Sequence, residues 1–363
     1  MTSDRAPIRF GSRLIGSGCP TFIMAELSAN HRQSFDKALE LVQLAKQVGA
    51  DAVKLQTYTA DTITIRSDRD EFLIKGGTLW DGQTLHDLYE EAHTPWDWQP
   101  KLKAVAAEIG LEFFSSAFDT TAVDFLESLN VAAHKIASPE LVDIPLIRKM
   151  ARTGKPLLMS TGMASLEEID EAVTAARQEG AVQLCLLKCT SAYPAPPEEA
   201  NLRTIIDLTQ RFGIHVGLSD HTMGIAVPVA AVALGACIIE KHLTDSRSNS
   251  GPDSAFSLEP HEFSEMVCAV RNAERALGRA HYGPTKLEMN TLKFRRSLFV
   301  VADVHKGAIF SNANVRSIRP ATGLHPRHLP SVLGRVATRD ILRGTPLAWN
   351  LVAEEPNVVA RAK

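Results

Sequence analysis

The chain has 363 residues, which is long enough for one large domain and a small one, and its composition of 45% hydrophobic and 22% charged residues is typical of a soluble globular protein. Its 39 Lys and Arg residues against 42 Asp and Glu residues give a net charge of −3, which excludes a basic surface for nucleic acid. No apolar run reaches about 18 residues and no signal-peptide pattern opens the chain, so we expect neither a membrane span nor secretion.

Short apolar runs alternate with helical periodicities along most of the chain. The predicted strands are residues 22–25, 52–56, 112–115, 134–136, 156–159, 182–188, 217–221 and 238–242. The predicted helices are residues 35–48, 95–109, 122–129, 144–151, 166–178, 202–212, 224–235 and 260–277, and a long polar insertion separates the second strand from its helix. Eight consecutive strand–helix units predict an α/β fold of the (β/α)8 TIM-barrel class, whose functional site lies at the carboxyl ends of the strands. A doubly wound open sheet is the alternative, but no G-x-G-x-x-G fingerprint follows the first strand.

The pattern changes to short β-like pieces and turns near the C-terminus. These pieces lie at residues 297–301, 305–307, 315–319, 323–326 and 341–346. We expect a barrel domain over residues 1–282, a linker over 283–293, a small β-rich domain over 294–352 and a tail over 353–363. So small a domain is expected to carry little core of its own and to lean on another surface.

Five cysteines bear on the redox compartment of the protein. They are odd in number and have no C-x-x-C spacing. We therefore expect reduced thiols within the core of a cytoplasmic protein.

Two histidines, His221 and His242, end the last two predicted strands. Parallel strands bring their carboxyl ends to one edge, so we expect the two imidazoles to lie close together. A lone histidine at a strand end is more often a hydrogen-bonded core residue, but both strand ends carry further polar residues that a structural role does not need. Two neutral imidazoles with an incomplete ligand shell predict a site for one divalent metal ion.

Two lysines, Lys54 and Lys135, interrupt predicted strands that are otherwise apolar. An unpaired ammonium group is too costly to bury without a purpose. Serines follow several strands, and Ser160 precedes a predicted helix whose free N–H groups favour an anion. A single serine is more often a turn or cap residue. Together, however, these groups predict a pocket for a small, multiply charged anion, such as a phosphate with a carboxylate.

These residues lie in motifs that resemble the nonulosonic (sialic) acid synthase family. The matching motifs are E-L-S-A-N-H (26–31), V-K-L-Q-T (53–57), K-I-A-S (135–138), S-T-G-M (160–163), L-K-C-T-S-A-Y-P (187–194), G-L-S-D-H-T (217–222), E-K-H (240–242) and G-P-D (251–253). R-R-S-L (295–298) and R-S-I-R-P (316–320) resemble the family's C-terminal antifreeze-like (SAF) domain.

Within this family, five further segments are most similar to the pseudaminic acid synthases. They are F-L-I-K-G-G (72–77), L-Y-E-E-A-H-T-P-W (88–96), F-S-S-A-F-D (114–119), P-A-P-P-E-E-A-N-L-R-T-I (194–205) and D-S-A-F-S-L-E-P (253–260). Ala-Ser-Pro-Glu at 137–140 differs from the Gly-Ser-Gly-Glu usual in neuraminate synthases, which argues against N-acetylmannosamine as acceptor.

The resemblance implies condensation of phosphoenolpyruvate with a 2,4-diacetamido-2,4,6-trideoxyhexose of altrose configuration, with carbon–oxygen cleavage. An N-acetylneuraminate or legionaminate synthase with a manno-configured acceptor is the alternative. His221 and His242 are implied ligands of Mn²⁺, with Mg²⁺ or Co²⁺ as alternatives, and Glu26 is the implied proton carrier. The implied phosphoenolpyruvate contacts are Lys54, Ser116, Lys135, Ser138, Ser160, Ser191 and Ser219. The implied sugar contacts are Gln56, Glu140, Tyr193, Asp253 and Arg319, the last reaching from the SAF domain of the partner in a homodimer.

Three other interpretations stay open at the level of sequence, one of which is a related phosphoenolpyruvate-condensing synthase that acts on a sugar phosphate. A Schiff-base aldolase would use Lys54 or Lys135 as its nucleophile and would need no metal. A non-enzymatic role, with the SAF-like region as an ice- or carbohydrate-binding module, leaves the polar residues at the strand ends unexplained.

Overall fold

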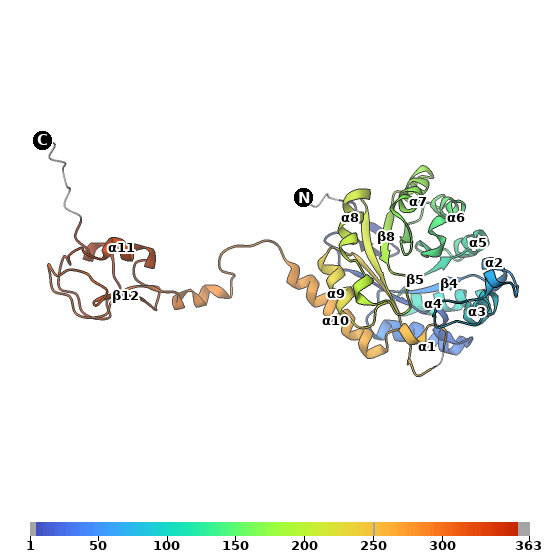
Figure 1. The fold of residues 1–363 in the computed structure, drawn as a ribbon, viewed down its shortest axis with the longest axis horizontal. Coiled ribbons are helices and arrows are strands. Elements are labelled where there is room, and N and C mark those ends of the chain that lie inside the picture. The colour runs from blue at the N-terminus through green and yellow to red at the C-terminus, as the bar shows by residue number, and fades with distance from the viewer. Residues whose placement is uncertain (1–4, 250, 355–363) are drawn as a thin grey trace. The chain divides into compact units, whose positions relative to one another are not determined.

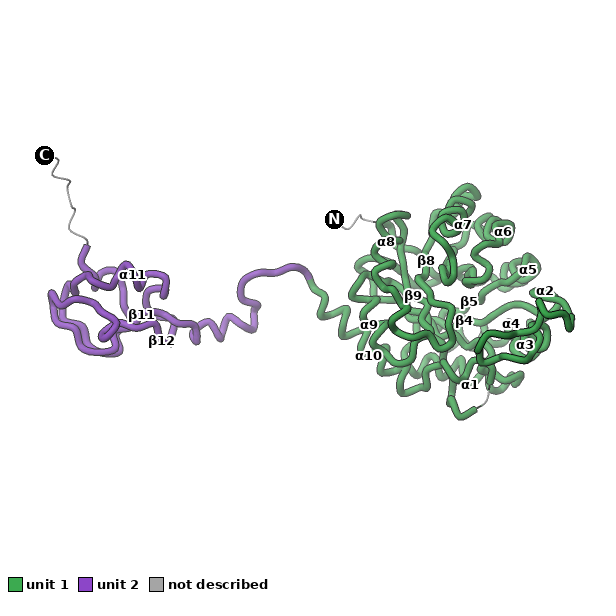
Figure 2. Tube along the Cα trace, viewed as in Figure 1, with its two compact units in different colours: residues 1–278 green, residues 279–363 purple. Residues whose placement is uncertain are grey.

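The structure is a computed structural model that describes residues 5–249 and 251–354. The chain divides into two compact units, Met1–Gly278 and Arg279–Lys363, shown in green and purple in Figure 2. Of the predicted C-terminal tail, residues 355–363 lie outside the described part of the chain.

The first unit is a closed barrel of eight parallel strands. The strands are β3 (Phe22–Glu26), β4 (Ala52–Thr57), β5 (Glu112–Ala117), β6 (His134–Ile136), β7 (Leu157–Ser160), β8 (Leu184–Cys189), β9 (His215–Asp220) and β10 (Ile238–His242). Each strand pairs with the next in sequence, and β10 closes the barrel on β3 through pairs that run from Ile238 opposite Phe22 to His242 opposite Glu26. The predicted TIM barrel is confirmed, and the alternative open sheet is wrong.

Eight helices alternate with these strands and surround the barrel (Figure 1). They are α1 (Phe35–Gln47), α4 (Gln99–Glu108), α5 (Thr120–Ser128), α6 (Ile144–Ala151), α7 (Leu166–Gln178), α8 (Arg203–Phe212), α9 (Ala226–Ala233) and α10 (Pro260–Leu277). Helix α7 illustrates why they form: Ser165 and Glu168 make a reciprocal capping box at its start. Its residues Ile169, Ala172 and Val173 recur at helical spacing and are buried against the barrel core.

The starts of three strands differ from those predicted. Strand β7 begins at Leu157 and not at Pro156. Strand β8 begins at Leu184 and not at Val182, whose side chain is 87% exposed. Strand β9 begins at His215 and not at Gly217. His215 is buried because its Nε2 lies 3.0 Å from the carbonyl oxygen of Ala6, so a polar residue occupies a strand position that hydrophobicity alone does not reveal.

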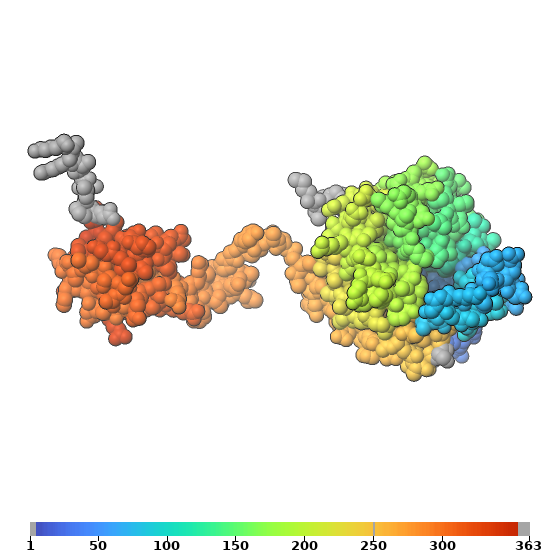
Figure 3. All heavy atoms as spheres, viewed as in Figure 1, coloured from blue at the N-terminus to red at the C-terminus, as the bar shows by residue number. Residues whose placement is uncertain are grey.

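The insertion after β4 contains ordered structure of its own. Helices α2 (Ala60–Ile63) and α3 (Leu85–Ala92) flank a turn closed by a bridge between Leu73 and Thr84. Figure 3 shows this insertion, in blue, on the surface of the first unit. Short 3-10 helices occur here and in other connections of this unit: η1 (Ser28–His31), η2 (Asp70–Phe72), η3 (Trp96–Trp98), η4 (Pro139–Val142), η5 (Pro197–Glu199) and η6 (Ser254–Phe256).

An N-terminal hairpin of β1 (Ile8–Phe10) and β2 (Arg13–Ile15) covers the amino end of the barrel. The ring of Phe10 packs 4.8 Å from that of Phe22, the first residue of β3, and 4.9 Å from that of Phe114. The amino end is therefore closed by side chains, and a site can open only at the carboxyl end.

The second unit is built around the antiparallel pair β11 (Ser297–Val300) and β12 (Val315–Ile318). Its helices are η7 (Glu288–Phe294), η8 (Pro326–His328), α11 (Leu329–Val332) and η9 (Trp349–Leu351). Leu298, Val300, Phe310 and Leu347 belong to a buried cluster that lies wholly within this unit. The expectation that this unit carries little hydrophobic core is wrong. Its buried cluster takes single apolar residues from several short segments, and each segment is too short to show a strand or helix periodicity.

Two expectations about thiols and membranes can be compared with the structure. All five cysteines are free; Cys268 is exposed, unlike the core position expected for it. Among the described residues, every helix is too short or too polar to cross a membrane.

Candidate active site at the carboxyl end of the barrel

The pairing register brings the predicted residues together on neighbouring strands. His242 lies opposite Glu26, and Glu26 lies opposite Lys54. On the next strands, Ser116 lies opposite both Gln56 of β4 and Lys135 of β6. These residues occupy the carboxyl ends of five adjacent strands, as the sequence predicted.

Lys54 is the centre of a buried charged cluster. Its ammonium group is ion-paired with Glu26, lies 3.7 Å from Oε2 of Glu240, and donates to Oγ of Ser116 at 3.2 Å. Burial opposes the charged form, but the carboxylates of Glu240 and Glu26 raise the pKa of Lys54. Oγ of Ser219 donates to Glu240 at 2.8 Å. Lys54 is therefore held as a cation.

Lys135 supplies a second buried cation. Its Nζ donates to Oγ of Ser160 at 2.7 Å and to the carbonyl oxygen of Ile136 at 2.7 Å. Burial lowers the pKa of Lys135. Burial also opposes ionisation of Glu240, yet the charges of Lys135 and Lys54 lower the pKa of that carboxyl group. A bound anion would relieve the unfavourable burial of two lysines at one site.

Glu26 differs from Glu240 in its protonation. It is completely buried, and burial raises its pKa to about 7, although the charge of Lys54 acts in the opposite direction. Its Oε1 accepts a hydrogen bond from the backbone N–H of Ser28 at 2.8 Å. A carboxyl group with this pKa can release or accept a proton near neutral pH.

Hydroxyl groups converge around Gly162, directly after β7. Its backbone N–H donates to Oγ of Ser138 at 3.1 Å. A Cβ atom added at Gly162 would collide with Oγ of Ser191 and would lie 2.7 Å from Oγ of Ser138. Only glycine fits this approach, so the predicted serines of three strand ends surround one backbone segment before α7.

The two imidazoles lie side by side, with ring centroids 5.3 Å apart. Nδ1 of His221 lies 2.9 Å from the carbonyl oxygen of Thr190, which places the proton on Nδ1 and leaves the lone pair of Nε2 for a ligand. Burial, together with the charges of His221 and Lys54, lowers the pKa of His242 well below its ordinary value, so that this imidazole is neutral. Nδ1 of His242 is buried without a hydrogen-bond partner.

This donor set fits a divalent ion with an open coordination shell. Within residues 5–249 and 251–354, His, Cys, Asp and Glu side chains form no group of three or more placed to hold a metal ion. The two histidines would therefore hold the ion with water or substrate completing its shell.

Cys189 also belongs to this site, although the sequence suggested only a core residue. Its sulfur lies 3.9 Å from Nδ1 of His221 and 4.0 Å from Oγ of Ser191. Burial disfavours the thiolate, but the hydrogen bond with His221 lowers the pKa of the thiol to about 7. The same contact raises the pKa of His221 against the effect of its burial.

The predicted sugar contacts of the barrel lie at or after the carboxyl ends of four strands, β4, β6, β8 and β10. The ring of Tyr193 lies 4.3 Å from that of His221. Asp253 is hydrogen-bonded to the hydroxyl of Ser28, and burial raises the pKa of its carboxyl group. Glu140 is half-buried in η4, where burial raises its pKa to about 7. Gln56 is half-buried near the end of β4.

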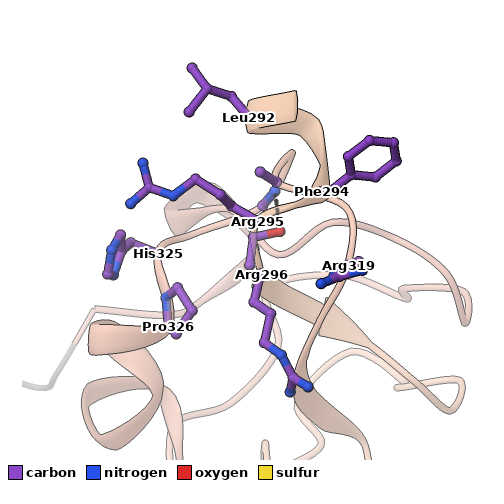
Figure 4. A pocket seen from close by; sticks show the side chains of 10 residues that line it. Leu292, Phe294, Arg295, Arg296, Arg319, His325 and Pro326 are labelled. Atoms are coloured by element: carbon purple, nitrogen blue, oxygen red, sulfur yellow. Dashed lines mark hydrogen bonds between the residues drawn. The ribbon is translucent and has the colours of Figure 1, made fainter. Parts of the chain in front are cut away.

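Arg319 belongs to the second unit and lines a pocket of about 640 Å³ there. Figure 4 shows Arg295 and His325 extending to one side of this pocket and Arg319 lying on the other. Phe294 adds an exposed aromatic ring to its rim. The role predicted for Arg319 toward the sugar stays a prediction.

Glu240 is a site residue to which we assigned no role from the sequence, although its spacing within β10 indicates one. Glu240 and His242 are two residues apart in β10, so their side chains share a face, and Lys241 points to the other face. Lys241 there forms a buried ion pair with Asp220 of β9. Glu240 therefore belongs to the site, whereas the Lys241–Asp220 pair is structural.

Trp80 and Phe256 also lie beside the site residues and were not predicted from the sequence. The ring of Phe256 lies 4.9 Å from that of His242 and 4.9 Å from that of Tyr193. The indole of Trp80 lies 5.7 Å from the ring of Tyr193. Both residues come from irregular connections, where the sequence offers no period to interpret.

Two family descriptions match this chain. Residues 41–282 match the NeuB family, and residues 295–353 match the SAF domain.

Several curated proteins are similar over most of its length. The chain is 45% identical over 326 residues to the pseudaminic acid synthase of Campylobacter jejuni, covering 90% of this chain and 95% of that protein. It is 44% identical over 331 residues to the pseudaminic acid synthase of Helicobacter pylori, covering 91% and 97%. It is 37% identical over 344 residues to the N,N'-diacetyllegionaminic acid synthase of Legionella pneumophila, covering 92% and 95%.

Solved structures agree with these similarities. The N-acetylneuraminic acid synthetase of Leptospira borgpetersenii has a TM-score of 0.71 at 30% identity, covering 81% of this chain and 98% of that one. The spore coat polysaccharide biosynthesis protein SpsE of Bacillus subtilis has a TM-score of 0.65 at 32% identity, covering 97% and 100%.

Proposed function

Because this chain belongs to the NeuB family, we propose that it is a pseudaminic acid synthase, which condenses phosphoenolpyruvate with 2,4-diacetamido-2,4,6-trideoxy-L-altrose. Its identity to pseudaminic acid synthases is 44–46%, against 36–37% to legionaminic acid synthases. This difference favours the altrose-configured acceptor over a manno-configured one. The observation that carries the proposal is the buried pair Lys54 and Lys135 beside the imidazoles of His221 and His242.

The two lysines suit phosphoenolpyruvate, which carries a phosphate and a carboxylate on adjacent positions. Glu240 is ionised but cannot neutralise both cations, and Glu26 is only partly ionised near neutral pH. The cluster therefore favours an anionic ligand electrostatically. The hydroxyls proposed to complete the anion site are those of Ser116, Ser138, Ser160, Ser191 and Ser219.

His221 and His242 are the proposed ligands of a divalent ion, Mn²⁺ in the first place, with Mg²⁺ or Co²⁺ as alternatives. A hydrogen bond to Thr190 orients one imidazole, and a low pKa keeps the other neutral, which supports this role. When bound, such an ion acts as a Lewis acid toward the aldehyde oxygen of the open-chain sugar.

The proposed reaction forms one carbon–carbon bond, adds the oxygen of water to carbon 2, and breaks the carbon–oxygen bond to phosphate. Carbon 3 of phosphoenolpyruvate bonds to the aldehyde carbon, and the aldehyde oxygen takes a proton to become a hydroxyl. Water adds its oxygen to carbon 2 and releases a proton; the bond from carbon 2 to the phosphate oxygen then breaks, the new hydroxyl on carbon 2 gives up its proton to become the ketone, and the leaving phosphate takes that proton. Glu26 is the proposed proton carrier, because its pKa of about 7 permits both transfers.

The acceptor would lie over the imidazoles, in contact with Gln56, Glu140, Tyr193 and Asp253. Arg319 is proposed to reach the acceptor from the SAF domain of a second subunit, which would make a homodimer the active form. We further propose that the enzyme works in the cytoplasm, where phosphoenolpyruvate is available.

A Schiff-base aldolase remains the rival enzyme class. Its nucleophile would have to be an uncharged lysine. The carboxylates of Glu240 and Glu26 raise the pKa of Lys54 and argue against that residue, whereas burial lowers the pKa of Lys135, which leaves Lys135 as the candidate nucleophile of an aldolase. Borohydride trapping of a lysine with substrate, together with full activity in EDTA, would favour the aldolase.

The test offers purified protein phosphoenolpyruvate together with one of three acceptors. These are the altrose-configured acceptor, its manno-configured counterpart and N-acetylmannosamine. Phosphate release and product mass are then followed. We expect efficient turnover only with the altrose compound. Preference for either manno-configured sugar would overturn the acceptor assignment.

A further inference from the structure

Trp80 reaches the site from the insertion between β4 and α4 and not from a strand end. The turn that carries it is well defined, because the carboxylate of Asp81 accepts hydrogen bonds from the backbone N–H groups of Gly77 at 2.7 Å and Thr78 at 2.8 Å. The backbone N–H of Ile74 donates to the carbonyl oxygen of Gln83 at 2.9 Å, and that of Gly82 donates to the carbonyl oxygen of Ile74 at 3.0 Å, which closes the base of the turn. The position of the indole is thus set by a rigid turn.

The indole connects the insertion to the loop after β10. Its Nε1 donates to the carbonyl oxygen of Pro252 at 3.0 Å, next to Asp253. Its ring lies 5.7 Å from Tyr193 and 6.4 Å from Phe256. Those two rings contact the imidazoles, so one aromatic ring separates Trp80 from each histidine.

Packing does not cover the indole completely. Trp80 is half-buried, and it lines a cavity of about 380 Å³ together with Leu79, Leu88 and residues 251, 252 and 255. Gln83 and Glu91, both exposed, complete the lining. The space beside the indole is bounded by the same loop that carries the predicted sugar contact Asp253.

We propose that Trp80 is a specificity-determining residue, whose half-buried indole receives the apolar, methyl-bearing end of the acceptor sugar. This inference rests on the proposed function, in which the acceptor is a 6-deoxy sugar that carries a methyl group where common hexoses carry a hydroxymethyl group.

Trp80 itself offers an added hydroxyl no partner, which explains the selectivity. The indole N–H of Trp80 is bonded to Pro252, and the neighbouring Phe256 has no polar side-chain atom. A sugar methyl group packs well on the indole face, whereas an added hydroxyl at that position would lose water without gaining a partner from either ring. Rejection of an added hydroxyl by an apolar pocket reaches about a hundredfold.

The test compares two acceptors that differ only at carbon 6, the 6-deoxy altrose compound and 2,4-diacetamido-2,4-dideoxy-L-altrose. We expect the full-length protein to favour the 6-deoxy compound by roughly 10- to 100-fold in kcat/KM. In Trp80→Ala this ratio should fall to within a few fold, through a higher KM for the 6-deoxy acceptor. Trp80→Phe keeps an aromatic ring and should keep most of the preference.

Leu79→Ala is the matched control, because Leu79 lies in the same turn and is 52% exposed. Its preference ratio should equal that of the unmodified protein. The affinity for phosphoenolpyruvate, measured by calorimetry, should be the same in all variants and shows that each is folded.

An unchanged ratio in Trp80→Ala, or an equal loss with both acceptors, would overturn the inference while leaving the proposed function intact. If Trp80→Ala does not fold, the ratio in Trp80→Gln decides, because its amide can pair with a hydroxyl and should raise turnover of the 6-hydroxy acceptor. If the unmodified protein converts neither acceptor, the proposed function itself is wrong and the inference falls with it.

Discussion

Replacing Lys135 by methionine tests the anion site most directly, because it keeps an unbranched side chain and removes the charge. The ammonium group makes two hydrogen bonds of 2.7 Å at the carboxyl end of the barrel. If it also binds phosphoenolpyruvate, the lost charge-assisted bond is worth about 1.5–3 kcal/mol. The dissociation constant for phosphoenolpyruvate should then rise roughly 10- to 150-fold.

The same substitution should not weaken the fold. Burial lowers the pKa of Lys135 below its unfolded value, so the charged lysine opposes folding near neutral pH, and this penalty is relieved only as the pH rises through the folded pKa. Methionine removes the penalty. Glu240 keeps Lys54 at 3.7 Å and the hydroxyl of Ser219 at 2.8 Å, so it is not left without partners.

Calorimetric titration with phosphoenolpyruvate, together with thermal unfolding, checks both expectations. Lys149→Met is a suitable control, because Lys149 lies on α6, pairs with Asp124 at 2.6 Å and is remote from the strand ends. It should bind phosphoenolpyruvate normally. Unchanged affinity in a folded Lys135→Met protein would refute the anion-site reasoning and make this lysine structural.

Three further predictions concern the metal, the pH and the second unit. His221→Ala and His242→Ala should each abolish turnover while circular dichroism stays unchanged, and activity lost to EDTA should return with Mn²⁺; normal rates in either variant would contradict the metal assignment. Burial raises the pKa of Glu140 from 4.5 to about 7, so the stabilisation from its protonated form is complete below pH 4.5 and is lost as the pH rises through 7. The free energy of unfolding, measured in urea, should be larger at pH 5 than at pH 8 through this group. Glu140→Gln should reduce this difference by an amount on the order of 3 kcal/mol; an equal difference in the variant would contradict the assignment. Inactive His242→Ala and inactive Arg319→Ala chains should regain activity when mixed, if Arg319 acts across a dimer; heterodimers seen by native mass spectrometry without activity would show that it does not.

The barrel could be predicted because each of its elements carries a local signal. Strand β7, for example, begins with three apolar residues in succession, and α7 combines a capping box with buried residues at helical spacing. The start of β9 escaped prediction because His215 is polar yet buried by a hydrogen bond to Ala6. Hydrophobicity does not report a polar group whose partner lies far away in the sequence.

From strand order alone, the candidate site could be predicted only at the strand ends. His221 and His242 follow from it, since parallel strands bring their carboxyl ends together, whereas Glu140, Tyr193 and Asp253 lie in connections and were predicted only through the family resemblance. Trp80 and Phe256 lie in connections, and their neighbours depend on how two loops fold over the barrel. The N-terminal hairpin could not be predicted either, because its two strands have only three residues each and are too short to show a period.

The pairing of β10 with β3 has a consequence for the synthesis of the protein. A ribosome completes residues 22–26 long before residues 238–242, so β3 waits without its final neighbour while most of the first unit is made. Ile23 and Met24, which are completely buried in the finished barrel, stay available for wrong contacts during that interval. Closure is therefore a late, long-range event, and it is expected to be slower than the formation of any single helix. Because Glu26 and His242 meet only at this seam, the candidate site cannot assemble before residue 242 has been made.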